Sequence, residues 1–208
     1  LEKERNKKKQ KKTWKQTITS CSQNFKKSQS HPNLQKNGWK TPVPAPAKGL
    51  NTVYFELTTL CPCSCLHCHI PLQLRRENPL SRSFEDLAVD FSVLKVKLNT
   101  ENLVISGGEP TLHKDILDIT EFASKLFRNV AVISNCVKPE ILKQISEHTT
   151  IWVSLDFYGE AQDSFRGFKG IWRNYLGIAD IANVRATLFK DNLNDIEKLV
   201  KFTAEHER

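Results

Sequence analysis

Four cysteines fall within eight residues of this chain, in the segment Cys61-Pro62-Cys63-Ser64-Cys65-Leu66-His67-Cys68. Cys61, Cys65 and Cys68 have CxxxC and CxxC spacing, and iron–sulfur clusters are bound by cysteine thiolates. A short loop with three thiolates can wrap one face of a cubane cluster and leave its fourth iron without a protein ligand. A substrate or cofactor can coordinate such an iron.

Zinc is the alternative for this loop, because CxC and CxxC pairs also occur in zinc sites and His67 or His69 could complete one. Structural zinc sites usually have a second ligand pair a dozen or more residues away, and this sequence has none. The loop alone therefore favours iron–sulfur over zinc without excluding zinc. Cys63 is an extra thiol, either a bystander or a ligand that exchanges with its neighbours.

A second motif, Gly107-Gly108-Glu109-Pro110, follows an apolar run that we predict to be a strand. Two glycines let the backbone approach a ligand closely, because no Cβ intervenes. The backbone groups of Gly108 and Glu109 could then hydrogen-bond a bound amino group. Alone, the motif could equally be a tight turn between a strand and a helix.

Taken together, the cysteine loop and the GGEP segment resemble the radical S-adenosylmethionine (SAM) superfamily. Its signature is CxxxCxxC after the first strand of a barrel, commonly with an aromatic residue before the last cysteine, where this chain has His67. The resemblance implies that Cys61, Cys65 and Cys68 bind a [4Fe–4S] cluster. The amine and carboxylate of SAM would chelate the fourth iron, and Gly107–Pro110 would bind the SAM amine.

Two later segments extend the resemblance to the ends of further predicted strands. Ser134-Asn135 stands where relatives often have Thr-Asn-Gly, with Cys136 in place of the glycine. Ser154-Leu155-Asp156 resembles the SLD element of the family, whose serine can contact SAM. We therefore add Ser134, Asn135 and Ser154 to the expected cofactor-binding residues, and we expect Asp156 to orient its loop rather than act as a base.

Arg166-Gly167 resembles the RG pair that often follows the SLD element. Arg166 either pairs with the SAM carboxylate or caps the adjacent loop, and both alternatives remain open. No residue is assigned as catalytic. We also expect that a side chain at Gly108 would obstruct SAM while sparing the cluster.

The activity implied by the resemblance is reductive cleavage of SAM to a 5′-deoxyadenosyl radical, which abstracts hydrogen from a substrate. The implied cofactors are the [4Fe–4S] cluster and SAM, and the implied electron donor is a flavodoxin or ferredoxin. The substrate, a small molecule or a peptide, is not readable, although the stretch from SLD to RG is similar to relatives that modify peptides or build cofactors. A cluster-binding remnant without turnover and a zinc-binding nucleic-acid module are the competing hypotheses.

Hydrophobic periodicity predicts an α/β fold in which five strands alternate with helices. The predicted strands are 52–57, 103–105, 130–133, 151–155 and 184–189. The predicted helices are one that follows Ser83, one with Ile116, Ile119, Ala123 and Leu126 on one side, one that begins at Pro139, one near 171–182, and one that includes Ile196, Leu199, Val200 and Thr203. Strands that are apolar on both faces predict a parallel sheet covered by helices. Five βα units form a partial TIM-like barrel, one unit short of the six usual in the family.

Charge divides the chain into two predicted regions. Residues 1–50 carry thirteen Lys/Arg and two Glu, a net charge of +11, whereas residues 51–208 carry eighteen Lys/Arg and twenty-one Asp/Glu, a net charge of −3. We predict a disordered basic arm with a Pro-rich linker over 1–50 and an incomplete radical SAM core over 51–208. The arm is a solvated tail or, less favoured, a nucleic-acid-binding segment.

The remaining features bear on the compartment and on the ends of the chain. No apolar run reaches the eighteen residues of a membrane helix, no apolar stretch follows the N-terminal lysines as in a signal peptide, and clustered cysteines suit a reducing compartment. We therefore expect a cytoplasmic protein that does not bind membranes. Cys21 and Cys136 are isolated, so no auxiliary cluster is expected. Because the chain begins with Leu1 and contains no Met, we expect a fragment or an unusual start codon.

Overall fold

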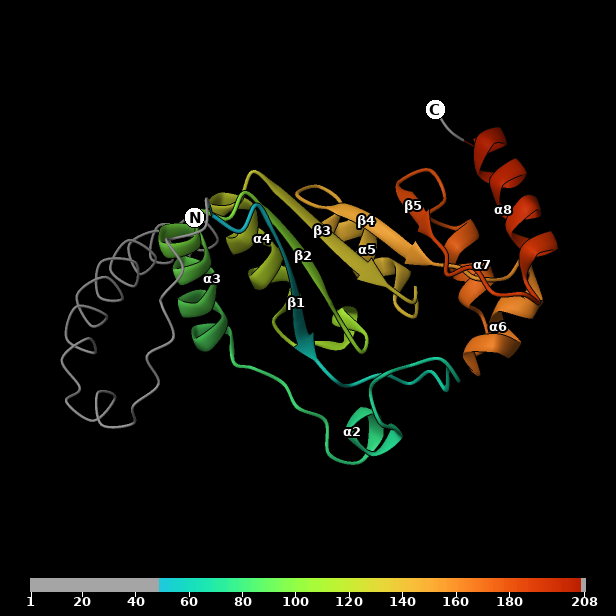
Figure 1. Ribbon diagram of the computed structural model, residues 1–208, viewed down its shortest axis with the longest axis horizontal. Helices are drawn as coiled ribbons and strands as arrows, with labels where there is room; N and C mark the ends of the chain where they lie inside the picture. The colour runs from blue at the N-terminus through green and yellow to red at the C-terminus, as the bar shows by residue number, and fades with distance from the viewer. Residues whose placement is uncertain (1–48, 207–208) are drawn as a thin grey trace, which may run out of the picture.

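Five parallel strands follow one another across a single sheet in the order in which they occur in the chain (Figure 1). The computed structural model describes residues 49–206, so nearly all of the predicted basic arm, Cys21 included, lies outside the described residues. The strands are β1 (Thr52–Thr58), β2 (Asn102–Gly107), β3 (Asn129–Ser134), β4 (Thr150–Ser154) and β5 (Ala182–Arg185). The connecting helices are α2 (Leu72–Arg76), α3 (Phe84–Leu98), the 3-10 helix η1 (Pro110–Leu112), α4 (Ile116–Leu126), α5 (Pro139–Ile145), α6 (Glu160–Arg166), α7 (Ile171–Leu176) and α8 (Leu193–His206). This is the predicted α/β fold, a parallel sheet that forms part of a TIM-like barrel.

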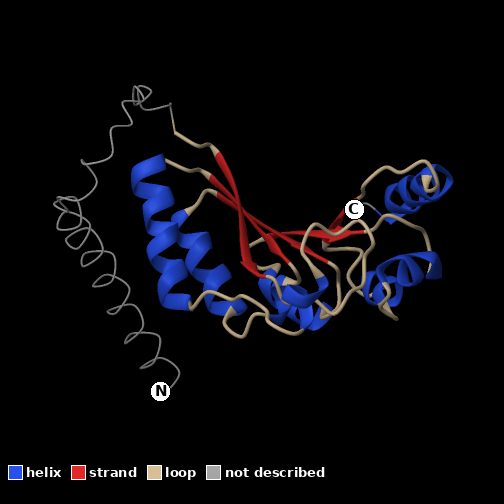
Figure 2. Ribbon diagram, turned by 60° about the horizontal axis from the view of Figure 1, so that its bottom comes forward, coloured by secondary structure: helices blue, strands red, loops and turns tan. Residues whose placement is uncertain are grey.

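The two faces of the sheet differ, which corrects the prediction that the strands are apolar on both faces. Residues on the helix-covered face, such as Ile105 and Val153, are fully buried. On the opposite face Glu56 pairs in register with Ser106, and Ser154 pairs with Arg185. Trp152 on that face is 36% exposed. Figure 2 shows the helices arranged in an arc around one side of the sheet. Within residues 49–206, no helix covers the other face, which carries polar side chains, as expected where a barrel interior holds a ligand.

Three predicted helices are confirmed as α3, α4 and α5, and each begins where its first-turn residues predicted. Ser83 caps α3, because its side chain accepts a hydrogen bond from the amide of Asp86 at 3.1 Å. Pro139 begins α5, where its missing N–H costs no helical hydrogen bond. Helix α4 begins at Ile116 and buries the apolar side that its periodicity predicted.

The predicted helix near 171–182 and the predicted strand over 184–189 need correction. Strand β5 ends at Arg185 rather than Phe189, because its neighbour β4 ends at Ser154, the residue that pairs with Arg185. Beyond that point the amide of Thr187 donates to the Asp156 side chain at 2.8 Å rather than to a backbone carbonyl of a neighbouring strand. Helix α7 ends at Leu176, where Gly177 provides the C-cap.

The last predicted helix is confirmed as α8, which includes Ile196, Leu199, Val200 and Thr203. Leu199 is buried at 2% exposure, whereas Val200 points outward at 61%. Among residues 49–206, no helix has the length and apolar character needed to cross a bilayer.

An aromatic cluster between α3, α4 and the sheet fixes the helices that flank the first two strands. Phe91 is fully buried and meets Phe55 of β1 edge to face, with ring centroids 5.3 Å apart. It also meets Phe127, just after α4, at 5.9 Å. Because β1 and β2 carry both sequence motifs into their following loops, this cluster supports the site indirectly.

We expect Phe91→Ala to lower the free energy of unfolding by about 3–5 kcal/mol, because it removes buried surface and leaves a cavity. Val96→Ala, in the same helix at a position that is 69% exposed, is the matched control and should change it by less than about 0.5 kcal/mol. Urea denaturation followed by circular dichroism measures both. Similar losses in the two variants would contradict the assignment of Phe91 to the core.

Candidate functional site

A cavity of about 530 Å³ lies at the carboxyl ends of the strands and is lined by most of the residues that the sequence predicted for the site. The predicted residues in its lining are Cys61, Cys65, Cys68, Gly107, Gly108, Ser134, Asn135, Ser154 and Arg166. Glu109 and Pro110 are buried beneath it and are not part of the lining. Parallel α/β folds place their ligand sites at this edge, because the loops that follow the strands meet there.

The cysteine loop follows β1 and is held by backbone hydrogen bonds to two helices. The amide of Cys61 donates to the carbonyl of Arg75 in α2 at 3.1 Å. The amide of Ser64 donates to the carbonyl of Arg166 at the end of α6 at 2.7 Å. Cys61 and Cys65 are nearly buried and Cys68 is partly exposed. The first half of the loop, at Cys61 and Ser64, is therefore anchored to two helices that lie far apart in the sequence.

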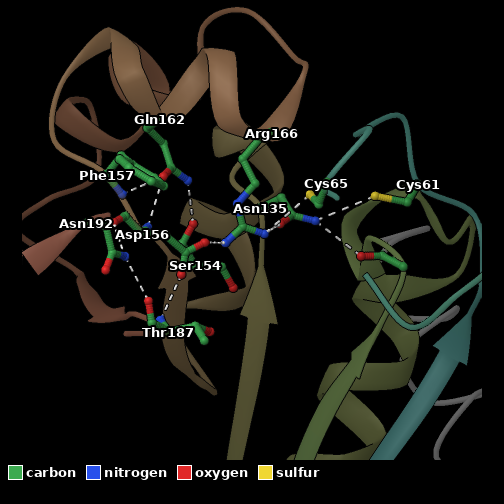
Figure 3. A network of polar contacts seen from close by, with 11 residues as sticks. Cys61, Cys65, Asn135, Ser154, Asp156, Phe157, Gln162, Arg166, Thr187 and Asn192 are labelled. Carbon is green, nitrogen blue, oxygen red and sulfur yellow. Dashed lines mark hydrogen bonds and ion pairs between the residues drawn. The ribbon is translucent and has the colours of Figure 1, made fainter. Parts of the chain in front are cut away.

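Side-chain donors from later loops reach two of the three predicted ligand sulfurs (Figure 3). Asn135 Nδ2 lies 3.6 Å from Cys61 Sγ, and Arg166 Nη1 lies 3.7 Å from Cys65 Sγ. Asn135 also bonds Arg166, with Oδ1 2.8 Å from Nη1. These contacts favour the thiolate over the thiol, and the thiolate is the form that binds a metal.

Cys63 has a role that the sequence left undecided. Its side chain is fully buried, does not line the cavity, and hydrogen-bonds Cys61 and Cys65. This donor is the main reason that the pKa of Cys65 is lowered to about 6, and the charge of Arg166 lowers it further. The same donor lowers the pKa of Cys61, while its two bonds raise the pKa of Cys63 itself. Cys63 thus acts as a hydrogen-bond donor between Cys61 and Cys65.

The two glycines of the GGEP segment lie directly against the cysteine loop. Gly107 has a φ of 127°, which L side chains rarely adopt. A Cβ on Gly108 would lie 2.4 Å from the carbonyl oxygens of Thr59 and Leu60. The amide of Gly108 donates to Thr58 O at 2.7 Å, so this N–H is committed to the loop rather than to a ligand. The motif therefore supports the cysteines as well as lining the cavity.

Glu109 connects the GGEP segment to the end of β3 through its fully buried carboxylate. It accepts hydrogen bonds from Thr111 N at 3.1 Å, Ser134 Oγ at 2.8 Å and Asn135 N at 2.6 Å. Burial raises the pKa of this carboxyl, and the hydrogen bonds oppose that rise. Through Asn135, the carboxylate fixes the side chain that reaches Cys61.

The backbone conformation of Cys136, the residue after Asn135, is one that favours glycine, the residue expected at this position from the family resemblance. Cys136 has a φ of 61°, in the left-handed region that favours glycine. Its side chain is fully buried, and this burial raises the pKa of the thiol to about 12. Cys136 therefore forms part of the turn after β3 and does not line the cavity.

At the end of β4, Asp156 and Arg166 form a buried ion pair (Figure 3). Asp156 also accepts the amide of Thr187, and Asn192 bonds the Asp156 carbonyl at 2.8 Å. Gln162 bridges to the Ser154 carbonyl at 2.8 Å. Asp156 thus orients the surrounding loops, in agreement with its predicted role. Both terminal nitrogens of Arg166 are engaged by protein groups.

The two histidines of the loop have partners other than a metal. His67 stacks on Phe165 with ring centroids 5.1 Å apart, and His69 Nε2 lies 3.1 Å from Glu56 Oε1. Within residues 49–206, no three His, Cys, Asp or Glu side chains are grouped so that they could hold one metal ion. This holds for the three predicted ligand cysteines as well as for the two histidines, so the grouping does not distinguish an iron–sulfur site from a zinc site.

The residues present fit an anionic cluster bound by thiolates. Arg75 and Arg166 are each 6% exposed, line the cavity beside the cysteines, and have an Nε atom without a hydrogen-bond partner. Buried cationic donors favour negative charge nearby, and hydrogen bonds to the sulfurs tune iron–sulfur clusters. Sequence reasoning missed Arg75, because it lies in a five-residue helix that has no motif of its own.

The contacts of Gly108 reverse our expectation that a side chain there would spare the cluster. We now expect Gly108→Ala to displace the cysteine loop and to lower the free energy of unfolding by about 1–3 kcal/mol, as overpacking does. Gly177→Ala is the control, because its Cβ would have only ordinary contacts, 3.4 Å from Asn174 O at the closest. Chemical denaturation measures the free energy of unfolding. The amount of iron bound after reconstitution shows whether the cysteine loop keeps the position that a cluster requires. Full iron binding by Gly108→Ala would contradict this view.

Comparison with known proteins gives a consistent result. Residues 55–202 match the family model described as "Radical SAM superfamily". The chain is 28% identical over 156 residues to the Fe-coproporphyrin III synthase of Methanosarcina barkeri, covering 69% of this chain and 38% of that protein. It is 31% identical over 126 residues to the subtilosin biosynthesis protein AlbA of Bacillus subtilis, covering 56% of this chain and 27% of that protein.

A solved structure shares the fold. Streptococcus suis SuiB bound to S-adenosylmethionine superimposes with a TM-score of 0.62 at 16% identity, covering 76% of this chain and 39% of that one. The chain thus spans less than half the length of each of these three proteins. The family uses a [4Fe–4S] cluster and SAM, the two cofactors that the sequence predicted. With its motifs, sheet and family match in agreement, this chain belongs to the radical SAM superfamily of enzymes.

Proposed function

We propose that Cys61, Cys65 and Cys68 hold a [4Fe–4S] cluster, and that the cavity beside them binds SAM for reductive cleavage. The observation that carries this proposal is the convergence of the cysteines, the GGEP glycines and the ends of β3 and β4 on one cavity of about 530 Å³. We assign this function to a core over residues 51–208, distinct from the basic arm over 1–50. The family match over 55–202 supports that division.

The chemistry of the reaction comes from the cofactors. A cluster held by Cys61, Cys65 and Cys68 would supply the electron for reductive cleavage of SAM, the chemistry that generates a 5′-deoxyadenosyl radical for hydrogen abstraction from the substrate. The chain itself binds and orients. The Gly108 carbonyl faces Asn135 Nδ2 at 3.3 Å and has a second lone pair for the SAM ammonium.

The other predicted residues divide between contact and support. Ser154 lines the cavity at the end of β4, where its hydroxyl can meet SAM. Arg166 pairs with Asp156 and reaches Cys65, so we assign it to orienting the cysteine loop rather than to the SAM carboxylate. Glu109 and Ser134 bond each other and set the position of Asn135.

The proposed substrate is a peptide or a cofactor precursor, with a flavodoxin or ferredoxin as electron donor. The names of the two relatives support this range, since one is a synthase of Fe-coproporphyrin III and the other a bacteriocin biosynthesis protein. The uncovered sheet face provides room beside the cluster. Tyr54, Glu56 and Arg185 on that face line the same cavity, and two of the three carry charge.

We predict that alanine at Cys61, Cys65 or Cys68 lowers bound iron well below four per chain, because three thiolates hold the cluster. Cys136→Ala is the matched control and should keep the full complement, since its thiol is buried away from the cavity. Iron and acid-labile sulfide are measured after anaerobic reconstitution. A Cys65→Ala protein that retains four irons would overturn the ligand assignment.

The experiment that tests the function is electron paramagnetic resonance of the dithionite-reduced protein with and without SAM. A reduced [4Fe–4S] signal that changes when SAM is added would support an open iron bound by the cofactor. Formation of 5′-deoxyadenosine then separates turnover from a cluster-binding remnant. A colourless protein that takes up one zinc ion would sink the proposal in favour of a zinc module.

A further inference from the structure

Three arginines hold the cysteine loop, and their electrostatic environments differ. Arg166 is buried and paired with Asp156. Arg76 is exposed and donates to Pro62 O at 3.0 Å and to Ser64 Oγ at 2.6 Å. Arg75, its neighbour in α2, is buried at 6% exposure. Of the two buried guanidinium groups, that of Arg166 has a carboxylate partner within the described part of the chain and that of Arg75 has none.

Arg75 is fastened to the cysteine loop by both its backbone and its side chain. Its carbonyl accepts the amide of Cys61 at 3.1 Å, and its Nη1 donates to the carbonyl of Cys63 at 2.8 Å. Its Nε is buried and has no hydrogen-bond partner. No Asp or Glu of residues 49–206 lies within ion-pair distance of it. The side chain lines the same cavity as Cys61 and Cys65.

A buried cation without a counterion is unfavourable, because it loses the hydration that it has in water. Proteins keep such a charge where a ligand of opposite sign balances it. A cluster bound by three thiolates is anionic, and it gains a further negative charge on reduction. Arg166 cannot fully balance that charge, because Asp156 already neutralises it.

We propose that Arg75 is the buried counter-charge of the cluster site, a positioning residue that stabilises the reduced cluster relative to the oxidised one. This inference rests on the proposed function, because it requires a cluster at Cys61, Cys65 and Cys68. Loss of the positive charge removes more stabilisation from the reduced state than from the oxidised state. The reduction potential therefore becomes more negative when Arg75 is neutral.

The test compares Arg75→Met, Arg75→Lys and Arg76→Met in the full chain with the unaltered protein. Each is reconstituted anaerobically, its iron content is measured, and its midpoint potential is determined without SAM by redox titration followed by electron paramagnetic resonance. We expect a more negative potential for Arg75→Met and a potential near that of the unaltered protein for Arg75→Lys. Arg76→Met, on the same helix and bonded to the same loop, should shift the potential by less than Arg75→Met does, because water screens the exposed charge of Arg76.

A second readout needs no cluster. In the apo protein, Arg75→Met removes an uncompensated buried charge, so its urea midpoint should equal or exceed that of the unaltered protein. If Arg75→Met fails to hold iron, retention of the cluster by Arg75→Lys would support the proposal that the positive charge at this position stabilises the cluster. Loss in both variants would show that the guanidinium geometry matters instead and would overturn the proposal.

The proposal is also wrong if Arg75→Met holds four irons at an unchanged potential, or if it lowers apo stability without shifting the potential. Either result would make Arg75 a structural residue of the loop. These outcomes are distinct from failure of the proposed function, in which the unaltered protein itself forms no [4Fe–4S] cluster.

Discussion

The close contact between the backbones of the GGEP turn and the cysteine loop is the constraint on which the rest of the site depends. No space for a Cβ exists between Gly108 and the carbonyls of Thr59 and Leu60. The amide of Glu109 donates to Leu60 O at 2.8 Å across the same contact. The loop therefore cannot move independently of β2, and the thiols that it carries are positioned by the sheet rather than by the loop itself.

Buried polar groups extend this constraint from β2 to the other strand ends. The carboxylate of Glu109 fixes Asn135 after β3, and Asn135 in turn bonds Arg166, whose partner Asp156 follows β4. Asp156 also accepts the amide of Thr187 after β5. Because unsatisfied members of a buried network are costly, each of these loops has one favoured position relative to the cysteines.

The balance of charge around the loop follows from the same network. Asp156 cancels Arg166, which leaves Arg75 as a buried cation whose balance must come from the cavity. Cys63 adds a thiol donor behind Cys61 and Cys65. Hydrogen-bond donors from Asn135, Arg166 and Cys63 thus reach the sulfur atoms of Cys61 and Cys65. In the part of the chain that the structure describes, no helix covers the polar face of the sheet, which leaves that side of the cavity available for SAM and a substrate.

The sequence by itself determined the family and the order of strands and helices, because each depends on local spacing or periodicity. The same local spacing predicted the three cluster ligands. It could not determine which face of the sheet is open, where β5 ends, or that Cys63 is a buried donor, since these depend on which strands pair and which loops pack together. Arg75 shows the limit most clearly. Nothing near it in the chain distinguishes it from Arg76, and only the tertiary structure buries one of them beside the cysteines and leaves the other in water, because burial depends on contacts between α2 and the cysteine loop.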